Sequence, residues 1–220
     1  MTTPDIEELT ADDPQDIMQW LTANSRWLTI ASVVVVVAAA SFWIYTQSQR
    51  TKEVNASKAL LLAQQSMNAG NPGLAKSDLE KMTSRYLGTA AGSEAAMLLA
   101  QLNYDQAKFQ EGVAVLERAA KAAPQPIEAE IRGLMGDGYL SMRNPVAAAK
   151  EYEHAADLTD HEMDRASQRA RAARAYTVAA DTAKARQLWE SLSQNTKNLS
   201  VAAEARVRLG ELSAKPATKS

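Results

Sequence analysis

The chain has 220 residues, of which 46% are apolar, 5% are aromatic and 23% are charged, and its net charge is −2. It contains no cysteine, which excludes disulfides, thiolate metal sites and a lipidated N-terminal cysteine. Residues 1–50 hold six acidic and two basic side chains, so the remainder is nearly neutral and gives no reason to expect a nucleic-acid partner.

Residues 1–25 form an acidic N-terminal segment with one short predicted helix. Asp13 can cap this helix, Pro14 suits its first turn, and Asp16 lies near the positive end of its dipole. Its apolar face would consist of Ile17, Met18, Trp20 and Leu21. The helix either binds a membrane surface or a partner, or is simply the chain approaching a bilayer. The absence of lysine and arginine favours the second interpretation.

Residues 26–46 are predicted to cross a membrane once. Trp27 to Tyr45 are 19 consecutive uncharged residues. As a helix they would cover roughly 28 Å, close to the roughly 30 Å hydrocarbon core of a bilayer. Aromatic side chains favour the headgroup boundary, so those at the two ends of the run are expected to anchor it. These membrane anchors are Trp27, Phe42, Trp43 and Tyr45.

Two alternatives to a membrane span were weighed. A buried core helix would need protein cover on every face, and nothing before residue 27 could supply it. A cleaved signal peptide would have an unusually long, acidic n-region and an apolar run that exceeds the usual length. Residues 47–55 are expected to form a short linker or an extension of the helix.

Residues 56–212 contain a repeat. Small residues recur at both ends of four segments whose spacing is 37, 36 and 37 residues. The segments are Ala63 to Ala75, Ala100 to Gly112, Gly136 to Ala148, and Ala173 to Ala185. Four residues after each segment comes a large side chain, namely Leu79, Leu116, Tyr152 or Trp189. Small residues let two antiparallel helices approach closely, and the large residue fills the space toward the next unit. Residues 213–220 would form a disordered tail.

Two of these units resemble tetratricopeptide repeats. Residues 98–124 and 134–158 carry small, aromatic and leucine residues where that repeat has them, including Phe109, Tyr139 and Pro124. The predicted fold class is therefore all-α: a single N-terminal transmembrane helix followed by a tetratricopeptide-repeat α-solenoid of about four helix pairs plus a capping helix.

The whole architecture is similar to that of the bacterial single-pass ancillary subunits of the Sec translocon. That resemblance implies an inner-membrane protein with a cytoplasmic N-terminus and a periplasmic repeat domain. It also implies protein partners, namely translocon subunits, periplasmic chaperones or exported clients, and help in handing over exported proteins. The flanking charges oppose this orientation, because Arg50, Lys52 and Lys58 follow the span whereas only Arg26 precedes it.

The sequence predicts no catalysis and no cofactor. His154 and His161 are the two histidines, too few for a zinc site without partners from distant units. Glycine-rich phosphate loops and HExxH motifs are absent. Glu151 and Glu153 are two residues apart on a predicted helix and so face different directions.

A protein-binding groove is expected along the first helix of each unit. The resemblance to tetratricopeptide repeats places Leu60, Gln64 and Met67 there, then Met97, Gln101 and Tyr104, then Gly133, Asp137 and Leu140, then Ala170, Arg174 and Thr177. Apolar and amide groups in the first two units suit an extended apolar peptide; the alternative is that these residues only contact neighbouring helices. The lysine and asparagine clamp by which some relatives hold a carboxylate tail is missing, so no such binding is expected.

A basic run follows, formed by Arg165, Arg169, Arg171 and Arg174. It is either a patch for acidic partners or lipid headgroups, or a solvated helix face partly balanced by Glu162 and Asp164. At the level of the whole protein, the predicted function is a membrane-anchored adaptor near the Sec translocon. The alternative is a structural subunit of an envelope assembly complex.

Overall fold

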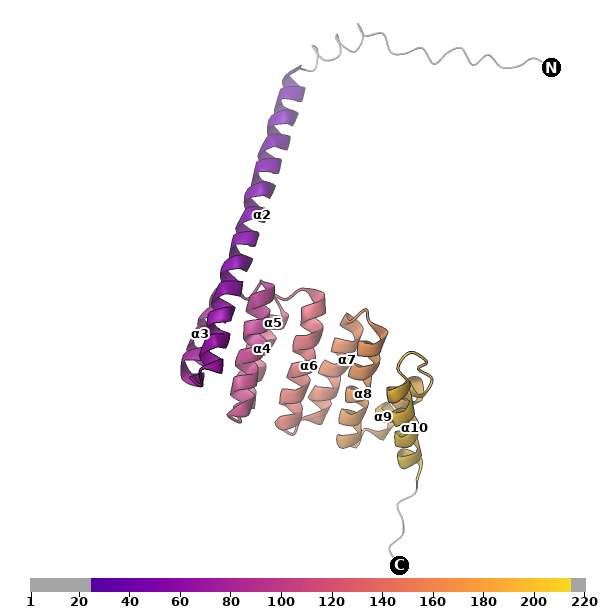
Figure 1. Ribbon diagram of the computed structural model, residues 1–220. Coiled ribbons are helices and arrows are strands. Elements are labelled where there is room, and N and C mark those ends of the chain that lie inside the picture. Colours follow the sequence, from indigo (N-terminus) through magenta and orange to yellow (C-terminus); the bar gives the residue numbers. More distant parts are fainter. Residues whose placement is uncertain (1–24, 215–220) are drawn as a thin grey trace, which may run out of the picture. The chain divides into compact units, whose positions relative to one another are not determined.

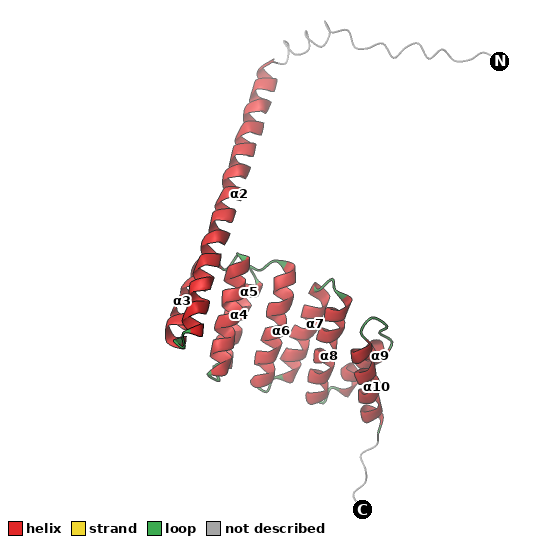
Figure 2. Ribbon diagram, in the orientation of Figure 1, coloured by secondary structure: helices red, strands yellow, loops and turns green. Residues whose placement is uncertain are grey.

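The structure is a computed structural model that describes residues 25–214. Within this range the chain forms nine α-helices and no strand, which confirms the predicted all-α class (Figure 2). The chain divides into two units between Thr51 and Lys52. The short helix expected after Asp13 lies outside the described residues.

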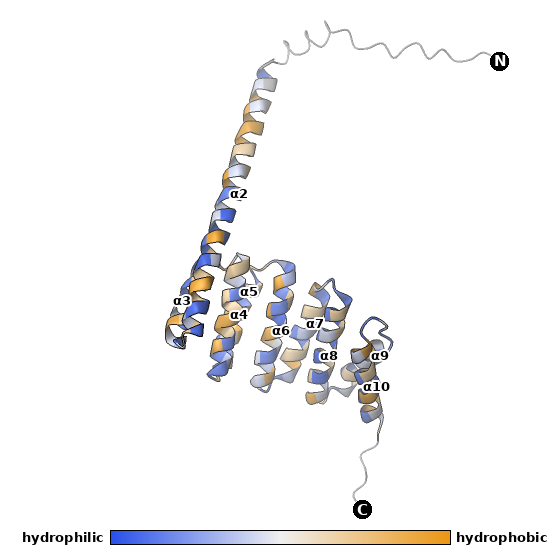
Figure 3. Cartoon of the chain, viewed as in Figure 1, coloured by the Kyte–Doolittle hydropathy of each residue, from blue (hydrophilic) through white to orange (hydrophobic). Residues whose placement is uncertain are grey.

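Helix α2 (Ser25–Asn68) is continuous over 44 residues. Residues 47–55 are therefore an extension of the helix and form no irregular linker. Its first half is largely apolar, whereas its second half mixes polar and apolar residues (Figure 3). This helix is long and apolar enough to cross a membrane. Its most apolar stretch is not buried by any other described part of the chain.

The solenoid is built from the C-terminal part of α2 and eight further helices (Figure 1). These are α3 (Pro72–Tyr86), α4 (Ala90–Asp105), α5 (Phe109–Ala120), α6 (Gln125–Ser141), α7 (Pro145–Leu158), α8 (Glu162–Val178), α9 (Thr182–Ser193) and α10 (Leu199–Ser213). From α3 onward each helix packs against the next in the chain, and α4 also contacts α6. The prediction of four helix pairs and a capping helix is confirmed.

The core follows the predicted alternation of small and large residues. All eight small positions of the frame are buried. The four large side chains, Leu79, Leu116, Tyr152 and Trp189, are at most 1% exposed. Two apolar clusters result, one from α2 to α6 and one from α7 to α10, and half-buried Tyr139 packs against both. Since each unit touches mainly its neighbours, a repeating small-to-large pattern is sufficient to specify the stack.

The turn inside each helix pair has one recurring geometry. The residue that follows the C-cap has a positive φ in all four pairs, at Gly70, Ala107, Arg143 and Ala180. In the second pair, Ala107 N–H donates to Tyr104 O at 2.8 Å and Lys108 N–H donates to Asn103 O at 2.8 Å. These two bonds form the Schellman motif, which satisfies carbonyls at the end of a helix.

Candidate protein-binding groove

A hollow of about 560 Å³ lies on the first helices of the first three units, α2, α4 and α6. All of its lining residues belong to the solenoid unit. Its apolar lining consists of Leu60, Leu61, Ala90, Ala91, Met97 and Ile127. Its polar lining consists of Glu53, Ser57, Gln64, Glu94 and Glu130. We call this hollow the α4 groove.

The repeat frame explains why these residues meet. Leu60 and Gln64 lie about one helical turn apart on α2, so they share a face. Met97 occupies on α4 the frame position that Leu60 occupies on α2. Ala90, at the start of α4, contributes only a methyl group to the lining. Three of the predicted groove residues, Leu60, Gln64 and Met97, therefore line one cavity.

Glu53 joins α2 to the beginning of α4. Its two carboxylate oxygens accept hydrogen bonds from Ala90 N–H at 3.1 Å and Ala91 N–H at 3.2 Å. Thr89 Oγ1 accepts from Gly92 N–H at 3.0 Å, so side chains satisfy three of the first N–H groups of α4. A carboxylate at this end also interacts favourably with the helix dipole. Glu53 thus holds one wall of the α4 groove in place.

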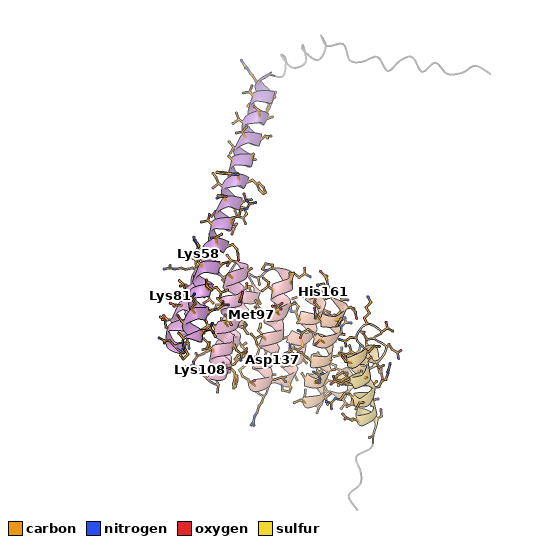
Figure 4. The ribbon with its side chains drawn as sticks, viewed as in Figure 1. Lys58, Lys81, Met97, Lys108, Asp137 and His161 are labelled. Atoms are coloured by element: carbon orange, nitrogen blue, oxygen red, sulfur yellow. The ribbon has the colours of Figure 1, made fainter. Side chains whose placement is uncertain are left out.

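A second hollow of about 500 Å³ lies at the start of α6, the end of α7 and the start of α8. It is lined by Gln125, Pro126, Ala129, Glu130, Ala155, Leu158, Thr159, Asp160, His161, Asp164, Ser167 and Gln168. We call it the α8 groove. Glu130 lines both hollows. Figure 4 marks Met97 on α4 and His161 beside the start of α8.

The acidic lining was not predicted from the sequence. Glu94 and Glu130 occupy the same position of successive repeats, and Ser57 and Ser167 occupy it in the first and last units. The expected groove positions followed the resemblance to other repeats, and the resemblance draws no attention to this position. The signal that could have revealed it is the recurrence of glutamate in two adjacent units at the repeat spacing.

Tyr104, an expected groove residue, lies between two glycines of the solenoid. A Cβ atom on Gly112 would overlap its ring, and a Cβ atom on Gly138 would overlap its hydroxyl. The hydroxyl donates to Leu134 O at 3.2 Å and so connects α4 to α6. Burial, with a further contribution from Asp137, raises the pKa of Tyr104. The contacts of this side chain are thus between neighbouring helices.

Asp137 connects three helices and lines neither groove. It accepts hydrogen bonds from Tyr152 Oη at 2.6 Å and from Arg171, whose guanidinium lies 4.3 Å from the centre of the Tyr152 ring. Burial, followed by the hydrogen bond to Asp137, raises the pKa of Tyr152. This cluster joins α6, α7 and α8.

The other expected groove residues are spread over the solenoid. Met67 is half-buried and packs against the first apolar cluster. Gln101 is exposed and donates to Asp105 at 3.0 Å on its own helix. Leu140 is 37% exposed. Arg174 donates through Nε to Glu204 at 2.7 Å and so joins α8 to α10.

The basic run on α8 is paired within the chain. Arg165 pairs with Glu162 at 2.9 Å, and Arg169 lies 3.9 Å from Asp157. The remaining two arginines pair with Asp137 and Glu204, as described above. The interpretation as a balanced helix face agrees with these contacts, although the balancing carboxylates come from four helices and do not include Asp164.

The histidines and paired carboxylates do not converge. His154 is exposed on α7, and His161 is the N-cap residue of α8. Glu151 binds Arg132 at 3.1 Å, whereas Glu153 accepts from Tyr176 Oη at 2.6 Å. Among the described residues, no group of three or more acidic or histidine side chains could hold a metal ion.

The fold has relatives among solved structures. A Podospora anserina putative kinesin light chain with nearly identical TPR-like repeats superposes with a TM-score of 0.52 at 16% identity, covering 72% of this chain and 89% of that one. BtubC from P. vanneervenii superposes with a TM-score of 0.53 at 17% identity, covering 77% of this chain and 69% of that one. At these identities the likeness concerns the fold alone. No curated protein matches the sequence.

A match to a protein family covers more than half of the chain. The family is described as a tetratricopeptide repeat-like domain, and it matches residues 18–134 and, in a second alignment, residues 58–170. The helix pairs, the small-to-large core and the recurring turn agree with it. The chain belongs to the tetratricopeptide repeat-like domain family.

Proposed function

We propose that this protein is a membrane-anchored adaptor whose solenoid binds polypeptide segments of other proteins in the α4 groove and makes or breaks no bond. The observation that carries the proposal is the groove itself, a preformed hollow of about 560 Å³ with an adjoining set of apolar side chains. Leu61 is 56% exposed in it, and half-buried Met97 can adapt its shape to varied partners.

The anchor is the apolar part of α2, which inserts into a lipid bilayer as one span. The side chains of Trp27, Phe42, Trp43 and Tyr45 are between 62% and 74% exposed and would lie at the two interfaces. The exposed valines of residues 33–37 would face lipid. An exposed apolar helix of this length is costly in water, and a bilayer removes that cost.

The location follows from the architectural resemblance described above. An acidic N-terminal segment, one apolar span and an alanine-rich solenoid support a place in the bacterial inner membrane beside the Sec translocon, with the solenoid in the periplasm. The partners would be translocon subunits, periplasmic chaperones or exported clients. A reporter that is active only in the periplasm, fused after Ser220, tests the orientation. An inactive reporter in a well-expressed fusion would contradict the periplasmic location of the solenoid.

Site-specific photo-crosslinking tests the groove. A photoreactive amino acid at Leu61, exposed in the α4 groove, should capture polypeptides in intact membranes. The same group at Lys81, exposed on α3, serves as the control position (Figure 4). Changing Met97 to Asp should lower the yield at Leu61, with helical content unchanged. Equal capture at the two positions, or no effect of Met97→Asp, would contradict the proposal.

A further inference from the structure

We infer that the α4 and α8 grooves form one acidic track that selects an extended polypeptide segment carrying lysine or arginine next to apolar residues. This inference rests on the proposed function and specifies the chemistry of the segment. The two hollows have volumes of about 560 and 500 Å³ and share Glu130. Neither is lined by a lysine or an arginine.

The carboxylates of the track differ in what they already bind. Glu53 caps α4, and Glu94 accepts a hydrogen bond from Gln64 Nε2 at 3.1 Å. Glu130, Asp160 and Asp164 are exposed and form no ion pair with any residue between 25 and 214. These three carboxylates are thus available to a cationic partner.

On α6 and α8 the other carboxylates are paired, so Glu130 and Asp164 differ from the acidic residues of their own helices. Glu128 of α6 pairs with Arg132 at 2.8 Å, and Asp137, further along the same helix, pairs with Arg171. On α8, Glu162 pairs with Arg165 at 2.9 Å. Within α6 and α8, the carboxylates without an intramolecular cation are therefore the ones that line the track. Like charges left unpaired along one groove repel one another, and a basic segment would relieve that repulsion.

The shape of the track favours a polypeptide over a small cation. Among the described residues, no cluster has the ligand number that a metal ion needs. The α4 groove adds apolar contacts from Leu60, Met97 and Ile127, which a free cation would not use. First helices about 10 Å apart place α2 and α8 roughly 30 Å apart, a distance that about ten extended residues cover. Lysine and arginine would lay their aliphatic stems along the apolar lining and direct their charges to the acids.

Matched synthetic peptides test the inference. Three peptides of about twelve residues share the same leucines and carry lysine, serine or glutamate at the remaining positions. Their affinity is measured by fluorescence anisotropy on the full chain in zwitterionic lipid nanodiscs, with empty nanodiscs as the blank. The lysine peptide should bind about tenfold more tightly than the glutamate peptide, and its advantage should shrink as salt rises from about 0.05 to 0.5 M.

A double variant, Glu130→Gln with Asp164→Asn, removes two of the free carboxylates. It should weaken binding of the lysine peptide about fivefold and leave the serine peptide unchanged. The matched control is Glu80→Gln with Glu190→Gln, which removes two exposed carboxylates that line neither groove, and it should have no effect.

The outcomes separate this inference from the proposed function. Equal binding of all three peptides, sensitive to Met97→Asp but not to the double variant, would overturn the acidic track and leave the groove as a binding site. An equal loss in the double variant and its control would also overturn the track. Absence of binding by every peptide, together with no crosslinking from Leu61, would overturn both proposals.

Discussion

Asp137 on α6 accepts a hydrogen bond from the Tyr152 hydroxyl on α7 at 2.6 Å, while Arg171 on α8 binds the same carboxylate and stacks on the Tyr152 ring. One carboxylate thus joins helices from three successive positions of the solenoid. Hydrogen bonds to charged groups are worth more than neutral ones, and a partner left without its bond costs additional free energy.

Replacing Asp137 with alanine should lower the free energy of unfolding of the solenoid by about 1–2 kcal/mol, since it leaves Tyr152 and Arg171 without their acceptor. The measurement is the urea midpoint followed by circular dichroism. The control is Asp78→Ala, which removes only an exposed pair with Lys81 at 3.2 Å and should cost less than about 0.5 kcal/mol. Equal shifts in the two variants would contradict the role of the cluster.

Gly112 should tolerate no larger residue. A Cβ atom there would overlap the Tyr104 ring and lie 3.1 Å from Ala100 O, so Gly112→Ala should destabilise the solenoid by about 2 kcal/mol or more. In α10, Gly210 has nothing within 4 Å of an added Cβ, so Gly210→Ala should stabilise by about 0.5–1 kcal/mol through helix propensity. The measurement is the thermal unfolding of both variants. A stabilised Gly112→Ala chain would show that the close approach of the Tyr104 ring to residue 112 is not required.

Replacing Ala107 with glycine should stabilise the solenoid. The φ of Ala107 is 59°, in the left-handed region, where a Cβ atom costs about 1–2 kcal/mol. Glycine avoids this cost, but part of the gain is lost because glycine gives the unfolded chain more backbone entropy. Ala107→Gly should therefore raise the free energy of unfolding by about 0.5 kcal/mol. The opposite sign is expected for Ala114→Gly, because Ala114 is exposed in the interior of α5 and the change costs about 1 kcal/mol.

Lys108 is the one N-cap residue of the four intra-pair turns whose side chain makes no capping hydrogen bond. Asn71, Asn144 and Asp181 each accept a hydrogen bond from a backbone N–H of the following helix. Lys108→Asn should therefore stabilise α5 by about 1 kcal/mol, and Asn144→Ala should destabilise α7 by a similar amount. The measurement is the midpoint of chemical unfolding, which should rise for Lys108→Asn and fall for Asn144→Ala. Unchanged midpoints would contradict the capping role of these side chains.

The solenoid should lose stability above about pH 10. Burial raises the pKa values of Tyr104, Tyr152 and Tyr176, with hydrogen bonds to carboxylates adding to the last two. Tyrosine in the unfolded chain ionises near pH 10. A pKa raised in the folded state means that the stabilisation is complete below that pH and is lost as the pH rises toward the folded value. Tyr176→Phe should flatten this alkaline loss in denaturation curves recorded between about pH 8 and 11.

The sequence by itself determined the helical type of the elements, the pairing of the solenoid helices and the residues of their core. Small residues at a spacing of 36 or 37 residues and the large side chains that follow them, such as Leu116 and Trp189, specify contacts between neighbours in the chain. In a solenoid nearly all packing is of this kind, so a local pattern predicts it. The apolar run of α2 could also be predicted, because a candidate span is recognised from its length and hydropathy without knowledge of its tertiary contacts.

Only the tertiary structure decided which surface residues meet. Tyr104 shares the predicted frame with Met97, yet its ring fits between Gly112 and Gly138, a space created by the following two helices. The acidic track likewise depends on which carboxylates form an ion pair within the chain. Asp137 pairs with Arg171 from another unit, whereas Glu130 has no partner among the described residues. Side chains far apart in the chain choose their partners by packing geometry, and the periodicity of one helix carries no information about that choice.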